Sequence, residues 1–149
     1  LASRRQRQMC IRDSLTSALQ LIRILNPEAQ PNLKIFELIE NFFIILKGEE
    51  WIKNYILWEL KLFSLLGYNL ELEKIVTKIV KDENIFYKLK SQSEDRTIPN
   101  FLIENDFSAN DDDLIQGIKL VSDFLEKSIL KPNNLNQPLS RSQFLSNLK

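Results

Sequence analysis

The sequence contains no histidine, one cysteine, three glycines and five prolines among its 149 residues. The lack of histidine excludes catalytic triads that use an imidazole, histidine metal sites and the usual proton shuttle near pH 7. A single cysteine excludes an internal disulfide framework and a cysteine-based zinc cluster. No glycine-rich phosphate-binding motif occurs. These absences disfavour an enzyme, and we expect neither a metal nor a cofactor.

The first fourteen residues differ in composition from the remainder. They carry four arginines and one aspartate, net +3, and such a basic arm could bind nucleic acid. However, Met9 to Ser14 is what ATG-TGT-ATA-AGA-GAC-AG encodes, which resembles a transposon end used to prepare sequencing libraries. We therefore expect residues 1–14 to be translated adapter and the native start of the domain to be missing. Residues 15–149 then carry net −3, which disfavours a strong electrostatic hold on DNA by this piece.

The composition of the body is that of one globular domain. Hydrophobic residues make up 44% of the sequence, enough to fill a core. Apolar spacing predicts a helix over 15–26, broken by Pro27 and Pro31, and a second over 32–47. Their predicted buried residues are Ala18, Leu19, Ile22 and Leu25, then Leu33, Phe36, Ile39, Phe43 and Leu46. Gly48 is predicted to take a left-handed conformation after the second helix.

A third helix is predicted from about residue 50 to residue 66, with Glu49 and Glu50 at its start and Gly67 at its end. It is apolar around most of its circumference, which is typical of the centre of a bundle. Its polar strip is narrow and is interrupted by Leu57; it consists of Lys53, Asn54, Lys61 and Ser64. The charged residues within the helix exclude a membrane span.

Residues 68–100 do not continue the helical pattern. Alternation around Ile85, Tyr87 and Leu89 predicts a short strand, and Thr97-Ile98 could return as a second strand. Residues 74–81 fit either a short helix or a strand, and residues 91–96 a polar turn. The sequence therefore predicts a small β-hairpin or irregular insert at about residues 73–99.

A fourth helix is predicted from an Asn110 N-cap to the break at Pro132, with Asp111 to Asp113 in its first turn. Its predicted buried stripe is Leu114, Ile118, Val121, Leu125 and Ile129. A last helix is predicted over residues 139–148. The fold class is therefore mainly α, with a small non-helical insert.

Glu59 lies in the middle of the apolar face of the third helix. A buried carboxylate costs several kcal/mol unless it is paired or hydrogen-bonded. We favour a structural Glu59 that meets one cation, with Arg23 and Arg141 as candidates. The alternative is a catalytic carboxylate, which needs a second polar group and an open pocket.

Two other patterns have simple structural interpretations. Asp111 to Asp113 could suggest a metal, but helix capping is favoured because the spacing of a calcium loop is absent. Five aromatic residues could stack nucleobases, but their helical spacing beside Leu and Ile favours a core. These are Trp51, Tyr55, Trp58, Phe63 and Tyr68.

The segment WELKLFSLLGYNLEL, residues 58–72, resembles the signature of the RecO family of DNA repair proteins. That family has a stretch of the form F-E-L-R-L-L-x-x-L-G-Y-x-P-x-L. The matching residues are Glu59, Leu60, Lys61, Leu62, Leu66, Gly67, Tyr68 and Leu72. Leu70 stands where proline is typical. Ser140-Arg141 is similar to the small residue–Arg pair that opens the family's last segment, and the lack of metal-binding cysteines is most like the alphaproteobacterial branch.

The resemblance implies the C-terminal helical bundle of a recombination mediator of the RecF pathway. RecO-like proteins join an N-terminal OB-fold to a helical domain and are not enzymes. They bind single- and double-stranded DNA, anneal strands, and with RecR load RecA onto DNA coated by single-strand-binding protein, SSB. We expect the OB-fold to be missing from these residues, and we therefore do not expect this piece alone to bind or anneal DNA. The resemblance also implies a cytoplasmic, nucleoid-associated protein with no membrane partner.

The resemblance further implies a site for the acidic, hydrophobic C-terminal tail of SSB on the helical domain. Such a site needs an apolar groove for a terminal Phe and nearby cations for carboxylates. Lys61, Lys131 and Arg141 are the candidate cations. An unrelated helical adaptor that docks partner helices remains the alternative function.

Overall fold

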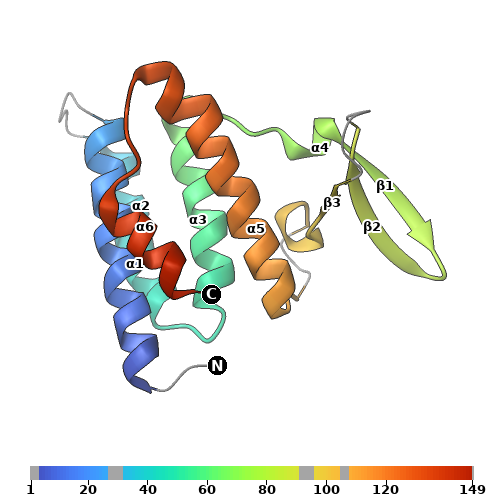
Figure 1. The fold of residues 1–149 in the computed structure, drawn as a ribbon, viewed down its shortest axis with the longest axis horizontal. Helices are drawn as coiled ribbons and strands as arrows, with labels where there is room; N and C mark the ends of the chain where they lie inside the picture. Colours follow the sequence, from blue (N-terminus) through green and yellow to red (C-terminus); the bar gives the residue numbers. More distant parts are fainter. Residues whose placement is uncertain (1–3, 27–31, 91–95, 105–107, 149) are drawn as a thin grey trace.

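The chain forms a bundle of helices with a small sheet projecting from one side (Figure 1). The computed structural model describes residues 4–26, 32–90, 96–104 and 108–148. The long helices are α1 (Arg4–Leu25), α2 (Leu33–Leu46), α3 (Trp51–Leu65), α5 (Asp111–Phe124) and α6 (Leu139–Asn147). The predicted mainly α fold with a hairpin insert is confirmed. The predicted break at Pro27 and Pro31 and most of the polar turn at 91–96 lie outside the described residues.

Helix α3 lies at the centre of the bundle, as its apolar circumference predicts. It packs against α2 and α5, and Tyr55 reaches α1, where its hydroxyl lies 3.4 Å from Ser17 Oγ. The Tyr55 ring also meets Phe42 of α2 and Phe144 of α6, at centroid distances of 5.7 and 5.0 Å. The aromatic residues of α3 therefore join four helices, and the core interpretation is confirmed for Trp51, Tyr55, Trp58 and Phe63, all buried.

The end of α3 is closed by Gly67, whose φ is +93°. The Gly67 amide donates to the Ser64 carbonyl and the Tyr68 amide to the Phe63 carbonyl, at 3.1 and 2.8 Å. This is the Schellman pattern, which requires a left-handed residue after the helix. The same prediction for Gly48 is wrong, because Gly48 has no positive φ. Helix α2 ends instead on hydrogen bonds between residues three apart, from the Lys47 amide to the Ile44 carbonyl and from the Gly48 amide to the Ile45 carbonyl.

The predicted buried stripe of α2 is correct only in part, because Ile39 and Leu46 are half-buried against the core whereas its other three residues are exposed. The buried residues are Ile35, Leu38 and Phe42. Leu33, Phe36 and Phe43 are exposed, at 71, 56 and 48%. At 100° per residue the two sets lie on roughly opposite sides of the helix. Only contact with α3 decides which side is covered, and that contact cannot be read from α2 alone.

Helix α1 begins at Arg4, eleven residues before the predicted start at Leu15. Cys10 and Ser14 are buried, and the Asn147 side-chain amide of α6 donates to Asp13 at 2.7 Å. Further along, Ser140 donates to Gln20 at 2.5 Å. The first and last helices therefore lie side by side along their length (Figure 1). The adapter origin of residues 1–14 stays a prediction.

The insert is a three-stranded antiparallel sheet of β1 (Val76–Lys81), β2 (Asn84–Leu89) and β3 (Thr97–Ile98), in that order. One helical turn, α4 (Leu72–Ile75), precedes it, so the segment at 74–81 is mostly strand. Asp82 and Glu83 both have positive φ and form a two-residue hairpin turn, as in type I′ turns. That turn carries no glycine or asparagine signal, so the sequence did not indicate it.

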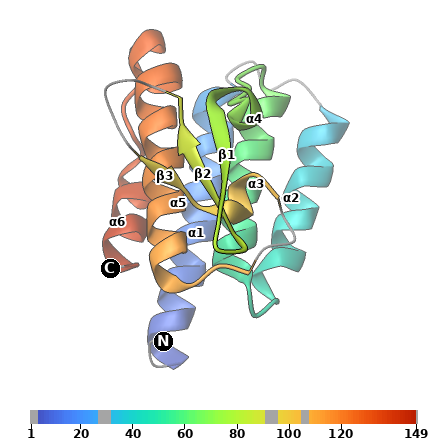
Figure 2. The same ribbon diagram turned by 90° about the vertical axis from the view of Figure 1, so that its right-hand side faces the viewer.

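The sheet is fixed to the bundle by its inner face and by the η1 turn (Asn100–Leu102). The Asn100 amide donates to the Ile85 carbonyl at 2.8 Å, and Tyr87 donates to Glu104 at 2.6 Å. A β-carbon on Gly117 of α5 would lie 2.7 Å from the Phe101 ring, so only glycine lets this turn approach so closely. Figure 2 shows the strands in front of the helices.

Helix α5 starts with the predicted cap. The Asn110 side chain accepts from the Asp113 amide, and the Asp113 carboxylate accepts from the Asn110 amide, at 2.8 and 3.1 Å. The helix continues as a π-helical segment, η2 (Leu125–Leu130), and a 3-10 turn, η3 (Lys131–Asn133). Ile118, Val121, Leu125 and Ile129 are buried as predicted, while Leu114 is half-buried.

We expect Gly67→Ala to lower the free energy of unfolding by about 1–2 kcal/mol, because a side chain disfavours the left-handed region. A β-carbon there meets no atom within 4 Å, so backbone strain is the only cost. Urea denaturation followed by circular dichroism measures the change. Gly48→Ala is the matched control and should stay within 0.5 kcal/mol of the parent, roughly the scatter of surface substitutions. Equal losses in both variants would contradict the assignment.

Candidate functional site

The family-like motif centres on a buried ion pair. Glu59 of α3 and Arg141 of α6 are both fully buried, and the Arg141 guanidinium donates to Glu59 Oε2. A second guanidinium nitrogen donates to Ser122 Oγ of α5 at 3.0 Å. Of the two predicted cations for Glu59, the partner is therefore Arg141, and Arg23 is exposed.

Burial raises the pKa of the Glu59 carboxyl, and the Arg141 guanidinium opposes that rise. Burial alone lowers the pKa of Arg141, but the Glu59 charge and the nearby Tyr55 raise it by more. The guanidinium therefore stays protonated. Because Glu59 has no exposed surface, a substrate cannot reach it, and the pair is a structural tie between α3, α5 and α6.

The other residues of the motif complete the same element. Leu62 is buried, Leu66 and Gly67 form the end of α3, and Tyr68 follows it. The Asn133 side chain of η3 donates to the Tyr68 hydroxyl at 3.2 Å and to the Ile129 carbonyl at 2.6 Å. The motif therefore supplies the carboxylate of a buried charge pair and the end of α3. The charge pair contacts α5, and the residue that follows the helix end contacts η3, which continues α5.

The three predicted partner-binding cations lie in different environments. Arg141 is in the core, whereas Lys61 and Lys131 are exposed. Lys131 begins the η3 turn, close in sequence to Asn133, which contacts Tyr68. Lys61 lies on the opposite side of α3 from the core and lines a cleft.

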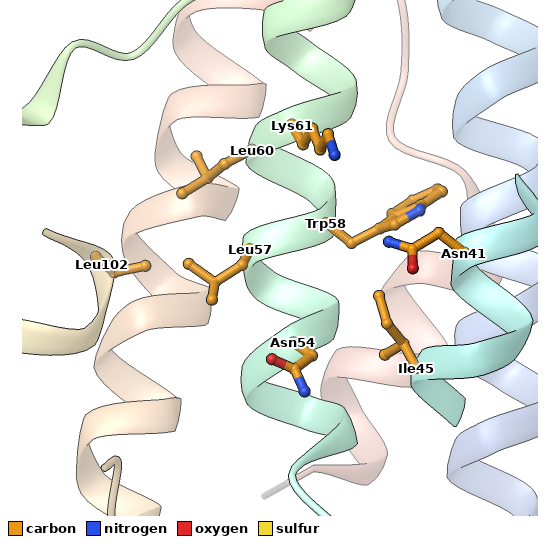
Figure 3. Close-up of a pocket in the computed structure, with 8 residues that line it drawn as sticks. All are labelled: Asn41, Ile45, Asn54, Leu57, Trp58, Leu60, Lys61 and Leu102. Carbon is orange, nitrogen blue, oxygen red and sulfur yellow. The ribbon is translucent and has the colours of Figure 1, made fainter. Parts of the chain in front are cut away.

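The cleft has a volume of about 570 Å³ and crosses the outer side of α3, from α2 to η1 (Figure 3). Its walls combine apolar side chains with two amides and one ammonium group. The lining residues are Asn41, Ile45, Asn54, Leu57, Trp58, Leu60, Lys61 and Leu102. Figure 3 shows Asn41 and Ile45 on the α2 side and Leu102 on the η1 side. This size is typical of ligand sites.

The cleft wall is held rigidly by the core. The Trp58 indole N–H donates to the Leu38 carbonyl at 2.8 Å, and its ring lies 4.9 Å from that of Phe42. Among the lining residues, Asn54 and Lys61 belong to the polar strip seen in the sequence, and Leu57 is the residue that interrupts it. Asn41 and Leu102 were missed, because they come from other elements and carry no periodic signal of their own.

Two remaining observations bear on the class of protein. Among residues 4–26, 32–90, 96–104 and 108–148, no group of three or more His, Cys, Asp or Glu side chains gathers as a metal site. No helix within this described part is long and apolar enough to cross a membrane. Asp113 has the capping role that we favoured over metal binding.

The motif of residues 58–72 therefore lies in a helical domain, and a sequence comparison shows the class of protein to which that domain belongs. The sequence model of the family described as "Recombination protein O C terminal" matches residues 14–136. This match covers more than half of the chain, so the chain belongs to the RecO family through that family's C-terminal part. An unrelated helical adaptor is therefore set aside.

Among curated proteins, the chain is similar to the DNA repair protein RecO of Rhodospirillum centenum, at 25% identity over 146 residues. The match covers 89% of this chain and 58% of that protein, so the chain spans little more than half the length of its relative. No solved structure matches the chain.

We expect Arg141→Met to destabilise the fold by about 3–5 kcal/mol, because it leaves the Glu59 charge buried without a partner. The double variant Glu59→Leu/Arg141→Met should lose less than the single variant, since no buried charge remains. Chemical denaturation of both variants and of Glu59→Leu completes the double-mutant cycle. Additive losses would show that the pair is not coupled.

Tyr55 should make the fold sensitive to alkaline pH. Burial, reinforced by the Glu59 charge, raises the pKa of Tyr55 above its ordinary value of 10.0. Above pH 10 the unfolded chain therefore loses a proton that the folded chain keeps, and stability falls with rising pH by roughly 1 kcal/mol per unit. Tyr55→Phe should flatten this slope by that amount, measured by urea denaturation between pH 9 and 11. Ser17→Ala, which removes only the hydrogen-bond partner, should leave most of the slope in place.

Proposed function

We propose that this chain is the helical part of a recombination mediator that acts in DNA repair, and that its α2–α3 cleft binds the C-terminal tail of SSB. The cleft beside Lys61 carries this proposal. Membership of the family and similarity to a protein named for DNA repair support the wider role.

The chemistry of the cleft suits an acidic peptide with an apolar end. Ile45, Leu57 and Leu60 offer apolar surface for a terminal aromatic side chain. Lys61 supplies a cation beside that surface for a carboxylate. The amides of Asn41 and Asn54 can donate to peptide carbonyls, which fixes the direction of the bound segment.

The remaining predicted cations have separate places in the proposal. Lys131 lies at the end of the bundle formed by η3 and Tyr68, where it can extend the positive surface. Arg141 is buried, so it positions α6 and does not contact the peptide. Contact with RecR, strand annealing, RecA loading and binding of single- and double-stranded DNA through an OB-fold belong to the proposed whole protein, which we place in the cytoplasm at the nucleoid. We propose no catalytic activity.

We expect Lys61→Glu to weaken binding of an SSB tail peptide by about tenfold or more, because a charge-assisted hydrogen bond becomes a repulsion. The probe is a fluorescein-labelled acidic peptide that ends in Phe, titrated onto the 149-residue chain by anisotropy. In a Trp51→Phe background, Trp58 is the only tryptophan, and its emission should change as the peptide enters the cleft. Removing the terminal Phe from the peptide should abolish that change.

Lys119→Glu is the matched control. Lys119 is also exposed and lines a smaller pocket of about 180 Å³ between α5 and α6, with Ile115 and Leu148. This variant has the same change in net charge and should bind the peptide within twofold of the parent. Loss of binding in Lys119→Glu with full binding in Lys61→Glu would move the peptide site to the second pocket and contradict the proposal.

A further inference from the structure

The small sheet ends in an open edge at β1. In the part of the chain that the structure describes, the strand order is β1-β2-β3, so β1 has a neighbouring strand on one side only. The hairpin of β1 and β2 also projects away from the helices (Figure 1). The edge of a sheet presents backbone N–H and C=O groups with which another strand can pair.

The register shows which residues of β1 carry these open groups. Lys81 precedes the two-residue turn and therefore belongs to a pair that exchanges both backbone bonds with β2. Such pairs alternate along the ladder, and the Lys90 amide, which donates to the Ile75 carbonyl at 2.9 Å, continues the series. The backbone groups of the intervening residues Lys78 and Val80 therefore point away from β2, toward the open edge.

This edge is weakly protected against pairing. Natural edge strands are often short or interrupted by proline or a bulge. Strand β1 has six residues without proline, and its pairing with β2 runs without a bulge. Val80 is 66% exposed, and the charges that protect the edge are those of Lys78 and Lys81. The Lys78 ammonium lies 3.8 Å from the Glu104 carboxylate, which offsets one of them.

A second copy of β1 fits this edge in one antiparallel register. When Lys78 lies opposite Val80 of the second copy, the open backbone groups of both strands face each other, and a two-fold axis passes between the two Ile79 residues. A shift of two residues in one direction sets the two Lys78 side chains directly opposite each other, which is destabilising. A shift in the other direction separates the two Ile79 residues, and a shift of one residue exchanges the two faces of the strand.

The same register makes the outer face of the sheet continuous. Phe86 is 41% exposed and lies opposite Ile79 in the β1–β2 pair. Across the two-fold axis, Ile79 meets its own copy, which lies beside Phe86 of the second copy. Aromatic and β-branched residues opposite one another stabilise a sheet. Lys81 lies opposite Thr77 of the second copy, so no two lysines face each other directly. The edge is therefore complementary to itself.

We propose that two copies of this chain associate through their β1 edges and join their three-stranded sheets into one continuous antiparallel sheet. The contact is smaller than a standard interface, so we expect association no tighter than micromolar. The edge is separate from the α2–α3 cleft, and the proposal does not rest on the peptide site. One dimer then carries two such clefts.

Sedimentation equilibrium of the 149-residue chain, from low micromolar to millimolar concentration, tests the association. The mass should rise from 17.5 kDa to twice that value. Ile79→Lys places two like charges beside the two-fold axis and should weaken association at least tenfold. Ile44→Lys is the matched control, because Ile44 is 68% exposed on α2, and it should stay within twofold of the parent.

A proline and a cysteine test the edge and its register. Val80→Pro removes an amide at the open edge but no bond of the β1–β2 ladder, so it should weaken association at least tenfold while circular dichroism matches the parent. In a Cys10→Ala background, Ile79→Cys should form an intermolecular disulfide on mild oxidation, because the Cα atoms of such a pair lie about 4.5 Å apart. Lys81→Cys lies on the same face, about 13 Å from its copy, and should not crosslink.

Three results would overturn the proposal. The first is a chain that stays at 17.5 kDa over the whole concentration range. The second is association that Ile44→Lys abolishes and Ile79→Lys leaves intact, which would assign the contact to α2. The third is equal crosslinking of Ile79→Cys and Lys81→Cys, which would exclude the antiparallel register. None of these measurements includes the SSB tail peptide, so their outcome is independent of the proposed function.

Discussion

The pairing of Glu59 with Arg141 is the constraint on which the rest of the structure depends. Two charges without access to water are tolerated only if each holds the other in place. Since Glu59 belongs to α3, Arg141 to α6 and the additional acceptor Ser122 to α5, satisfying this pair fixes three helices at once. The aromatic contacts of Tyr55, one turn earlier on α3, add α1 and α2 to the same assembly. The bundle is therefore organised around a polar centre within an apolar core.

Several features of the fold could be read from the sequence because each depends on one segment. The circumference of α3 predicted its central place, and a lone acid on an apolar face required a cation. The Asn110 cap and the Gly67 end are local chemistry. Features that depend on two segments could not be read. The two apolar faces of α2 are equal in sequence, and only the position of α3 covers Ile35, Leu38 and Phe42. The turn at Asp82 and Glu83 joins β1 to β2, but Asp-Glu lacks the glycine that marks most two-residue hairpin turns, so it did not stand out in the sequence.

In the sequence, only the narrow polar strip of α3 indicated the cleft, because the walls of the cleft come from α2 and η1. Its most buried lining residue, Trp58, also belongs to the core, since its indole bonds to Leu38 and packs against Phe42. A cleft wall that is part of the core has little conformational freedom to lose, which is consistent with the proposed peptide site. The outer face of the sheet is different, because it is held to the bundle through the η1 turn and the strand pairing around it. The cleft is therefore built into the core, whereas the sheet is an appendage of the bundle.

The pairing of α1 with α6 has a consequence for how the chain is made. Ser140 and Gln20 are 120 residues apart, and Asn147 and Asp13 are 134 apart. During translation, at about 5–20 residues per second, α1 is synthesised several seconds before α6. The contacts between α1 and α6 therefore form only after the whole stretch between them has been made, which places the pairing of these two helices late in the folding of the bundle.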